Sequence, residues 1–418
     1  MSVKCQMIAI VDYSVLMDLT AFTSDAPGSL VPIGGTDLRR GKWEHCAFVP
    51  HPLPDDSPEL TGATYRAVAD ARAALAALDS TARRLPNPRL FRRPSLQAEA
   101  QSTSALEGTY APLAEVLIAD REQPPNLDLR EILNYVTMAD SAFLWIENEH
   151  PLTVSMLSGL QEILVRGTRS ENSSSGTMRD HLVVVGQRSG TASSGLTVHA
   201  ARFVPPPPGN DLHASIQDLL DWTSRRVGNR EFDPVIAAAL AHYQFETLHP
   251  FNDGNGRIGR LLIVVHLQQQ DVLLEPTLTV SPWFESRRTE YYDHLLSVGT
   301  HGDWDSYVRF FARGLEASAR STHDRMLALV GVQSAMKDAV RESALRADTA
   351  HALVDFAVAN VSFTVRQVEQ ELSVSYGRAN GLVNQLVQLG ILENLNDRSA
   401  GGSRRFFAPA VFRVLVAD

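Results

Sequence analysis

Apolar residues recur at steps of three and four along most of the chain, which is the spacing of one face of an α-helix. In residues 65–85 this period is carried by Val68, Ala71 and Leu75, and Pro86 stops it. The same pattern predicts helices over residues 95–108, 127–144, 154–166, 212–226, 234–247, 257–270 and 287–297. The fold is therefore expected to be mainly α.

Patterns typical of β-strands are scarce. Residues 168–195 are rich in Ser, Gly and Thr and enclose the run Leu182-Val183-Val184-Val185, which predicts a strand carried by a loop or hairpin. Residues 36–58 are rich in Pro, Gly and mixed charge and are expected to form an extended lead-in.

The C-terminal part has the pattern of a separate module. Two short helical segments, 364–372 and 376–389, flank a turn, and the basic turn at 403–407 adds a wing, so we expect a winged-helix domain. Residues 341–418 hold eight arginines and eight acidic residues, which is less basic than most DNA-binding modules. DNA binding and docking of a protein both stay open, with Arg378, Arg398, Arg404 and Arg405 as a local basic patch.

Composition narrows the function classes. The 418 residues carry a net charge of −10, which argues against a sequence-independent binder of nucleic acid phosphates. The two cysteines, Cys5 and Cys46, are too few for a disulfide framework or a cysteine zinc site. No apolar run approaches the roughly 18–20 residues of a membrane helix, and no signal peptide is apparent, so a cytoplasmic protein is expected.

Most candidate functional residues lie in one segment of twelve residues, which reads His249-Pro250-Phe251-Asn252-Asp253-Gly254-Asn255-Gly256-Arg257-Ile258-Gly259-Arg260. Its glycines allow the backbone to approach a ligand closely, at the start of a new apolar helix. The N–H groups and dipole of a helix N-terminus favour phosphate. The string therefore predicts an anion site.

The charged side chains of this string suit a polyphosphate. Arg257 and Arg260 are three positions apart and project from one face of the first helical turn. Asp253 is a natural ligand for Mg²⁺ when phosphates supply the other oxygens. His249 is the base of the loop that is available at neutral pH.

The string resembles the signature of Fic-domain proteins, His-Pro-Phe-x-Asp/Glu-Gly-Asn-Gly-Arg-x-x-Arg, with every specified position filled. Residues 65–118, 203–208, 241–245 and 291–292 also fit the family pattern. Together with the sequence pattern, the resemblance divides the chain into four expected regions: an N-terminal extension (1–31), an N-terminal Fic-associated helical region (32–125), a Fic catalytic core with a short β-hairpin flap (126–325), and the winged helix (326–418).

The resemblance implies transfer of AMP from ATP, with Mg²⁺, to a Ser, Thr or Tyr hydroxyl of a target protein. His249 would act as general base and Asp253 would hold the metal ion. The expected contacts with ATP are Gly254, Asn255, Gly256, Arg257, Ile258, Gly259, Arg260, which would reach the γ-phosphate, and Tyr292. A homodimer stays open.

Two further segments acquire roles through the resemblance. Thr103, Glu107 and Gly108 fit the pattern Ser/Thr-x-x-x-Glu-Gly/Asn of an inhibitory helix, in which Glu107 would pair with Arg260 and block the γ-phosphate position. The strand Val183, Val184 and Val185, with Arg179 before it, falls where Fic proteins carry a flap that holds the target by strand addition.

Other functions remain compatible with the sequence. One is a nucleotide-sensing, DNA-binding transcriptional regulator, and another is a Fic enzyme that removes AMP or transfers a different phosphate-containing group. The target protein and its modified residue are not readable from the sequence.

Overall fold

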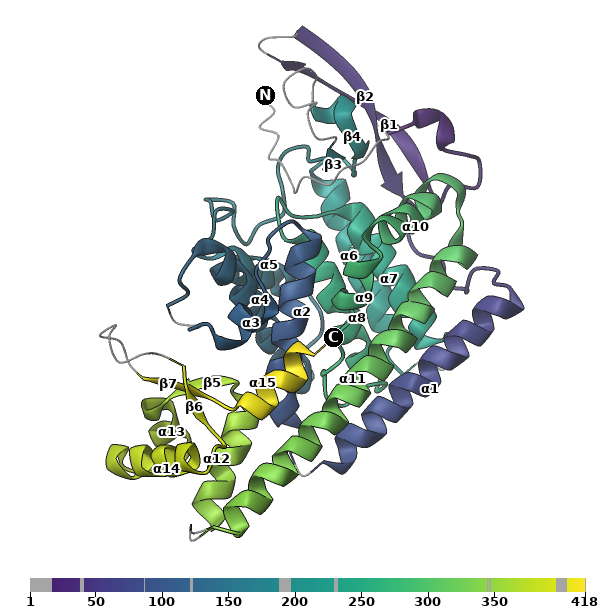
Figure 1. Ribbon diagram of the computed structural model, residues 1–418. Helices are drawn as coiled ribbons and strands as arrows, with labels where there is room; N and C mark the ends of the chain where they lie inside the picture. The colour runs from purple at the N-terminus through teal and green to yellow at the C-terminus, as the bar shows by residue number, and fades with distance from the viewer. Residues whose placement is uncertain are drawn as a thin grey trace.

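The computed structural model describes residues 17–37, 41–85, 87–120, 123–187, 197–228, 232–343, 345, 347–395 and 404–417. Helices dominate this part of the chain (Figure 1). The first half contains the helices α1 (Gly62–Arg84), α2 (Arg92–Leu106), α3 (Leu113–Ile118), α4 (Leu127–Glu147) and α5 (Val154–Val165). The second half contains α6 (Asn210–Arg226), α7 (Pro234–Leu248), α8 (Asn255–Gln269), α9 (Ser281–Ser286), α10 (Arg288–His301) and α11 (Trp304–Arg341).

The predicted helices are confirmed to within a few residues at each end, because the apolar spacing that predicts them is the face that becomes buried. Side chains also fix where several of them begin: the hydroxyl of Thr61 accepts the N–H of Thr64 at the start of α1, and the Asp233 carboxylate accepts that of Val235 at the start of α7. None of the described helices is both long enough and apolar enough to cross a bilayer.

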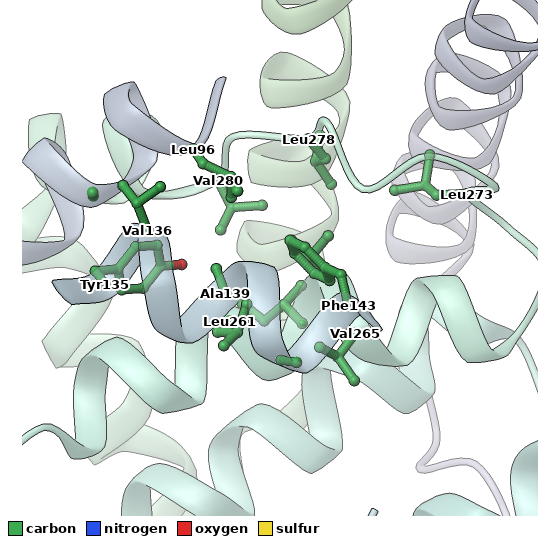
Figure 2. Close-up of a cluster of buried hydrophobic side chains, with 14 of the residues drawn as sticks. Leu96, Tyr135, Val136, Ala139, Phe143, Leu261, Val265, Leu273, Leu278 and Val280 are labelled. Carbon is green, nitrogen blue, oxygen red and sulfur yellow. The ribbon is translucent and has the colours of Figure 1, made fainter. Parts of the chain in front are cut away.

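A shared apolar core holds α2 and α4 against α8. Figure 2 shows side chains from these helices and from the segment after α8 meeting in one cluster, with labels on Leu96, Tyr135, Val136, Ala139, Phe143, Leu261, Val265, Leu273, Leu278 and Val280. All ten side chains are buried. The core therefore places the end of α2 beside the first turn of α8, although the two are far apart in sequence.

The longest helix, α11, packs along α1 and runs from the helical core to the C-terminal module (Figure 1). The predicted boundary between residues 325 and 326 falls within this helix, and the division of the chain into domains stays a prediction. A continuous helix carries the chain across it, and the C-terminal module begins at α12 (Ala347–Ala359).

An N-terminal β-hairpin replaces most of the expected lead-in. Strand β1 (Gly28–Asp37) pairs antiparallel with β2 (Gly41–Pro50), from Gly28 opposite Pro50 to Asp37 opposite Gly41. Phe48 and Trp43 of β2 are buried, and their neighbours Met17 and Val184 complete a second, smaller core. The boundary at residue 31 thus cuts a strand and is wrong. Residues 1–16 of the predicted extension lie outside the described part of the chain.

The C-terminal module combines α12 with β5 (Ser362–Thr364), α13 (Val365–Glu371), α14 (Tyr376–Gln388), β6 (Glu393–Asn394), β7 (Arg405–Phe407) and α15 (Pro409–Val416). The three strands form one antiparallel sheet in the order β5-β7-β6, and Ser375 caps α14. The two helices α13 and α14 match the predicted helix-turn-helix segments. The winged-helix assignment itself stays a prediction, and Arg398 lies outside the described residues.

Candidate active site

The predicted anion loop is the turn between α7 and α8. Helix α7 ends at Leu248, and His249 takes the left-handed backbone conformation with φ 50°. Gly254, with φ 89°, precedes the first residue of α8. The Asn255 side chain closes the turn, since its Oδ1 accepts the Phe251 N–H at 2.8 Å and its Nδ2 donates to the Phe251 carbonyl at 2.8 Å. Phe251 itself is fully buried, so it anchors the loop rather than contacting a ligand.

The imidazole of His249 is held in one orientation and kept neutral. Its Nδ1 donates to the Glu246 carbonyl at 3.3 Å, while the buried Nε2 has no hydrogen-bond partner among the described residues. Burial, together with the nearby charge of Arg179, lowers the pKa of His249 to about 4. At neutral pH the free Nε2 lone pair is thus able to accept a proton.

A pocket opens beside this imidazole. Its walls come from the end of α2, from strand β3 (Val185–Gln187) and β4 (Ala201–Phe203), and from α7, α8 and α10. The residues that line it are Leu106, Glu107, Val185, Gly186, Arg202, Phe203, Tyr243, Glu246, Thr247, His249, Gly256, Tyr292, Leu295, Leu296 and Gly299. The lining joins an apolar end at α10 to a polar end at the α7–α8 turn, which suits an amphipathic ligand.

The segment predicted to be inhibitory contacts Arg260 in this structure. The Arg260 Nη2 lies 2.6 Å from Glu107 Oε1, and its Nε donates to the Thr103 hydroxyl at 2.8 Å. Burial alone would lower the pKa of Arg260, but the Glu107 carboxylate together with the other acidic groups nearby outweighs burial and holds that pKa well above its usual value. Gly108, with φ 92°, ends the helix directly after Glu107. A Cβ at Gly256 would collide with the Glu107 carboxylate, so the glycine allows this approach.

The second arginine of α8 is also paired. Arg257 is buried between Asp253, whose Oδ1 it meets at 3.0 Å, and Glu131 of α4, with which it forms a short ion pair. Burial alone would raise the pKa of Asp253, but the Arg257 charge and hydrogen bonds, including the Gly254 N–H at 2.6 Å, lower it. Asp253 therefore stays ionised at neutral pH.

The donor set at Asp253 fits a metal ion that a phosphate ligand helps to hold. The ionised carboxylate has a partly exposed side chain, at 24%. Within the described part of the chain, no group of three or more His, Cys, Asp or Glu side chains gathers to form a metal site. A hard cation here would draw its remaining oxygens from phosphate and water, as Mg²⁺ does in nucleotide sites.

Comparisons with known proteins agree with this geometry. Residues 65–144 match the Fic/DOC family N-terminal region, and residues 151–267 match the Fic/DOC family. Residues 151–267 of this chain are thus similar to the Fic domain.

Several named proteins share the Fic-like stretch of this chain. The protein adenylyltransferase Fic of Drosophila willistoni is 37% identical over 115 residues, 28% of this chain and 21% of that protein. The protein adenylyltransferase fic-1 of Caenorhabditis elegans is 34% identical over 123 residues, 29% of this chain and 22% of that protein. The chain thus matches about a fifth of the length of these relatives.

A solved structure supports the Fic fold over a longer stretch. The crystal structure of a Fic family protein from Desulfovibrio desulfuricans G20 has a TM-score of 0.54 at 21% identity. The alignment covers 85% of this chain and 98% of that one.

The predicted target-binding flap needs correction. The run from Leu182 is not a strand until Val185, where β3 pairs with β4. Val183 and Val184 are buried instead of offering an edge, and Val184 belongs to the core beneath the N-terminal hairpin. Of the four predicted flap residues only Val185 lines the pocket. The flap's predicted Ser/Gly-rich extension, residues 188–195, lies outside the described part of the chain.

Arg179 has a different role from the one predicted. It is 2% exposed, and its guanidinium donates to the carbonyls of His249 at 2.8 Å and Pro206 at 2.6 Å. Arg179 therefore holds the backbone of the α7–α8 turn through these carbonyls. Because it is buried, it cannot contact a target at the protein surface.

Two acidic residues near the site are missing from the sequence prediction. Glu131 comes from α4, and Glu246 of α7 lines the pocket with its pKa raised to about 8, chiefly by burial and further by Glu107. A glutamate inside an apolar helical run was the signal available for both, and it does not reveal which cation it faces.

Proposed function

We propose that the protein is an adenylyltransferase that moves AMP from ATP to a hydroxyl side chain of a target protein. The observation that carries the proposal is the neutral His249, whose unpaired Nε2 belongs to the same pocket as the N-terminal turn of α8. The names of the relatives that share this domain support the same reaction.

The chemistry follows from the positions of these groups. His249 Nε2 takes the proton of the attacking hydroxyl, whose oxygen forms a bond to the α-phosphorus while the bond from that phosphorus to the bridging oxygen breaks and pyrophosphate leaves. The helix N-terminus and the α8 arginines offset the negative charge of the phosphates. When bound, Mg²⁺ would be held by Asp253 and would neutralise phosphate charge.

We propose that the described conformation is autoinhibited. The γ-phosphate of ATP would need the guanidinium of Arg260, and the Glu107 carboxylate already occupies it at 2.6 Å. Of the two side chains, Glu107 is the accessible one: it is 17% exposed, while Arg260 is fully buried. Displacement of Glu107 would leave Arg260 in place and ready to bind phosphate.

Labelled nucleotide tests the reaction. Wild type and Glu107→Gly are incubated with ATP labelled at either the α- or the γ-phosphorus, with His249→Ala as the inactive variant. Adenylyl transfer predicts that protein retains label from α-labelled ATP only and that His249→Ala retains none. Label from γ-labelled ATP would indicate a kinase, and no label from either would argue against transfer to this protein.

A DNA-binding role of the C-terminal module is a second candidate. Helix α14 contains no acidic residue, and its exposed N-terminal turn presents Tyr376 and Arg378, while Arg404 donates to Asn380 of the same helix at 2.6 Å. An acid-free helix of this kind suits a groove of DNA. Retention of a mixed pool of duplexes by wild type, lost in Arg378→Glu, would support it, and equal retention by both would contradict it.

A further inference from the structure

Arg257 divides its charge between two carboxylates from different parts of the chain. Asp253 belongs to the α7–α8 turn, and Glu131 lies inside α4, 126 positions before Arg257. The guanidinium is 2% exposed, so water does little to screen either contact. The contact with Glu131 is the shorter of the two.

The Glu131 side chain is itself held in place. Its Oε1 accepts a hydrogen bond from the Thr109 hydroxyl at 2.9 Å as well as from Arg257. Thr109 stands two residues after Glu107, at the end of the inhibitory segment. Glu131 does not line the pocket, and its carboxylate contacts Arg257 and Thr109 instead.

A carboxylate that bears the full charge of a buried arginine is a poor ligand for a divalent cation. The guanidinium repels the cation and also occupies the oxygen lone pairs that would bind it. Asp253 Oδ1 already accepts the Gly254 N–H and Arg257. Whatever draws Arg257 away from Asp253 therefore makes Asp253 a better metal ligand.

We propose that Glu131 is a positioning residue for the metal site: it takes up the charge of Arg257 and so leaves Asp253 able to hold a divalent cation next to the nucleotide phosphates. This rests on the proposed function, in which Asp253 is the metal ligand. It assigns to α4 of the N-terminal region a part in the reaction that is separate from the inhibition by Glu107.

Metal binding without turnover tests the proposal. Mn²⁺ replaces Mg²⁺ as the probe, and its affinity for the protein–ADP complex is measured by the electron paramagnetic resonance of free Mn²⁺. ADP affinity without metal is measured by calorimetry. Glu131→Gln is expected to weaken Mn²⁺ binding about tenfold while ADP affinity stays the same. Tenfold is the usual effect of removing a group that orients a metal ligand.

The matched control, Glu162→Gln on α5, removes the same charge from an exposed pair with Arg166 and is expected to change neither affinity.

The alternatives give different results. A general structural defect would weaken Mn²⁺ and ADP binding together, and either that or an unchanged Mn²⁺ affinity would overturn the proposal. Wild type that binds ADP but no Mn²⁺ would contradict the metal role of Asp253 as well. Strong Mn²⁺ binding to wild type and Glu131→Gln alike would contradict only the role of Glu131.

A second background keeps the test decisive if Glu131→Gln fails to fold. In Arg257→Met there is no guanidinium to draw away from Asp253. Adding Glu131→Gln to Arg257→Met should then leave the Mn²⁺ affinity unchanged, and it removes both members of a buried pair, which proteins often tolerate. A further loss of Mn²⁺ affinity in the double variant would overturn the proposal.

Discussion

The two arginines near the start of α8, Arg257 and Arg260, pair with carboxylates in different settings. Arg260 pairs with Glu107, which caps the end of α2 and forms part of the pocket wall. Arg257 pairs with Glu131, which lies within the 21 residues of α4 and away from the pocket. Both guanidiniums are buried, so the chemistry of the two pairs is nearly the same.

The difference lies in what each carboxylate is attached to. Glu107 follows the last turn of a helix and precedes Gly108, so a change in a few backbone angles is enough to withdraw it. Glu131 moves only if α4 moves, and α4 is packed into the core shown in Figure 2. The Glu107–Arg260 pair is therefore suited to be broken during regulation. The Glu131–Arg257 pair is suited to stay in place and hold the site together.

His249→Ala is expected to have the largest effect and to leave both pairs untouched. Loss of the base should lower AMP transfer by about 10²–10⁴-fold, because proton removal is the step it serves. ATP affinity, measured by calorimetry, should change little, since the proposed phosphate contacts come from α8. The control His266→Ala removes another buried histidine that does not line the pocket. Transfer that survives in His249→Ala would remove His249 from the role of base.

The free energy of unfolding should depend more on the Glu131–Arg257 pair than on the Glu107–Arg260 pair. Glu131→Ala leaves a buried arginine with one partner fewer and is expected to lower the free energy of unfolding by about 3–5 kcal/mol. Glu107→Ala should cost about 1–3 kcal/mol, because its carboxylate is partly exposed and Thr103 still accepts from Arg260. Urea unfolding of the two variants measures both. A greater loss for Glu107→Ala would reverse the assignment.

His249 should contribute to the pH dependence of stability, beside His242 and His266, whose pKa values burial also lowers. The folded pKa of His249, about 4, lies below its unfolded value of about 6.5, so the unfolded chain binds more protons between those values. Stability from this group is therefore complete above pH 6.5 and falls as the pH drops toward 4. Urea midpoints across this range should show a shallower slope for His249→Gln than for wild type, and equal slopes would mean that His249 is not buried as a neutral group.

The sequence was sufficient for the parts of the site that are local. The α7–α8 turn and the helices on either side follow from twelve consecutive residues and an apolar period, and the segment at Glu107 was predicted through the family resemblance. The structure brings Glu107 to Arg260, 153 positions away, as that resemblance implied.

The parts that the sequence did not predict depend on distant packing. The pairing of Glu131 with Arg257 has no local sequence pattern, since an acidic residue in an apolar helix does not indicate which basic residue it will pair with. Pro32, Gly34 and Gly35 obscured strand β1, which gains its partner only when β2 folds back on it. Val183 and Val184 have the composition of a strand, but both are buried outside the strand β3, and Val184 packs under the hairpin.

The central claim is that Glu107 withholds Arg260 from ATP, and initial rates of AMP incorporation test it most directly. Wild type, Glu107→Gly, Arg260→Ala and the double variant are compared at equal ATP, with Glu149→Gly, an exposed glutamate just after α4, as the matched control. Glu107→Gly should be faster than wild type by about tenfold or more, since about 1.4 kcal/mol of lost pairing already gives that factor.

Arg260→Ala should be slow, the double variant should resemble it, and the control should match wild type. Equal rates for wild type and Glu107→Gly, with both folded and binding ATP, would contradict the account.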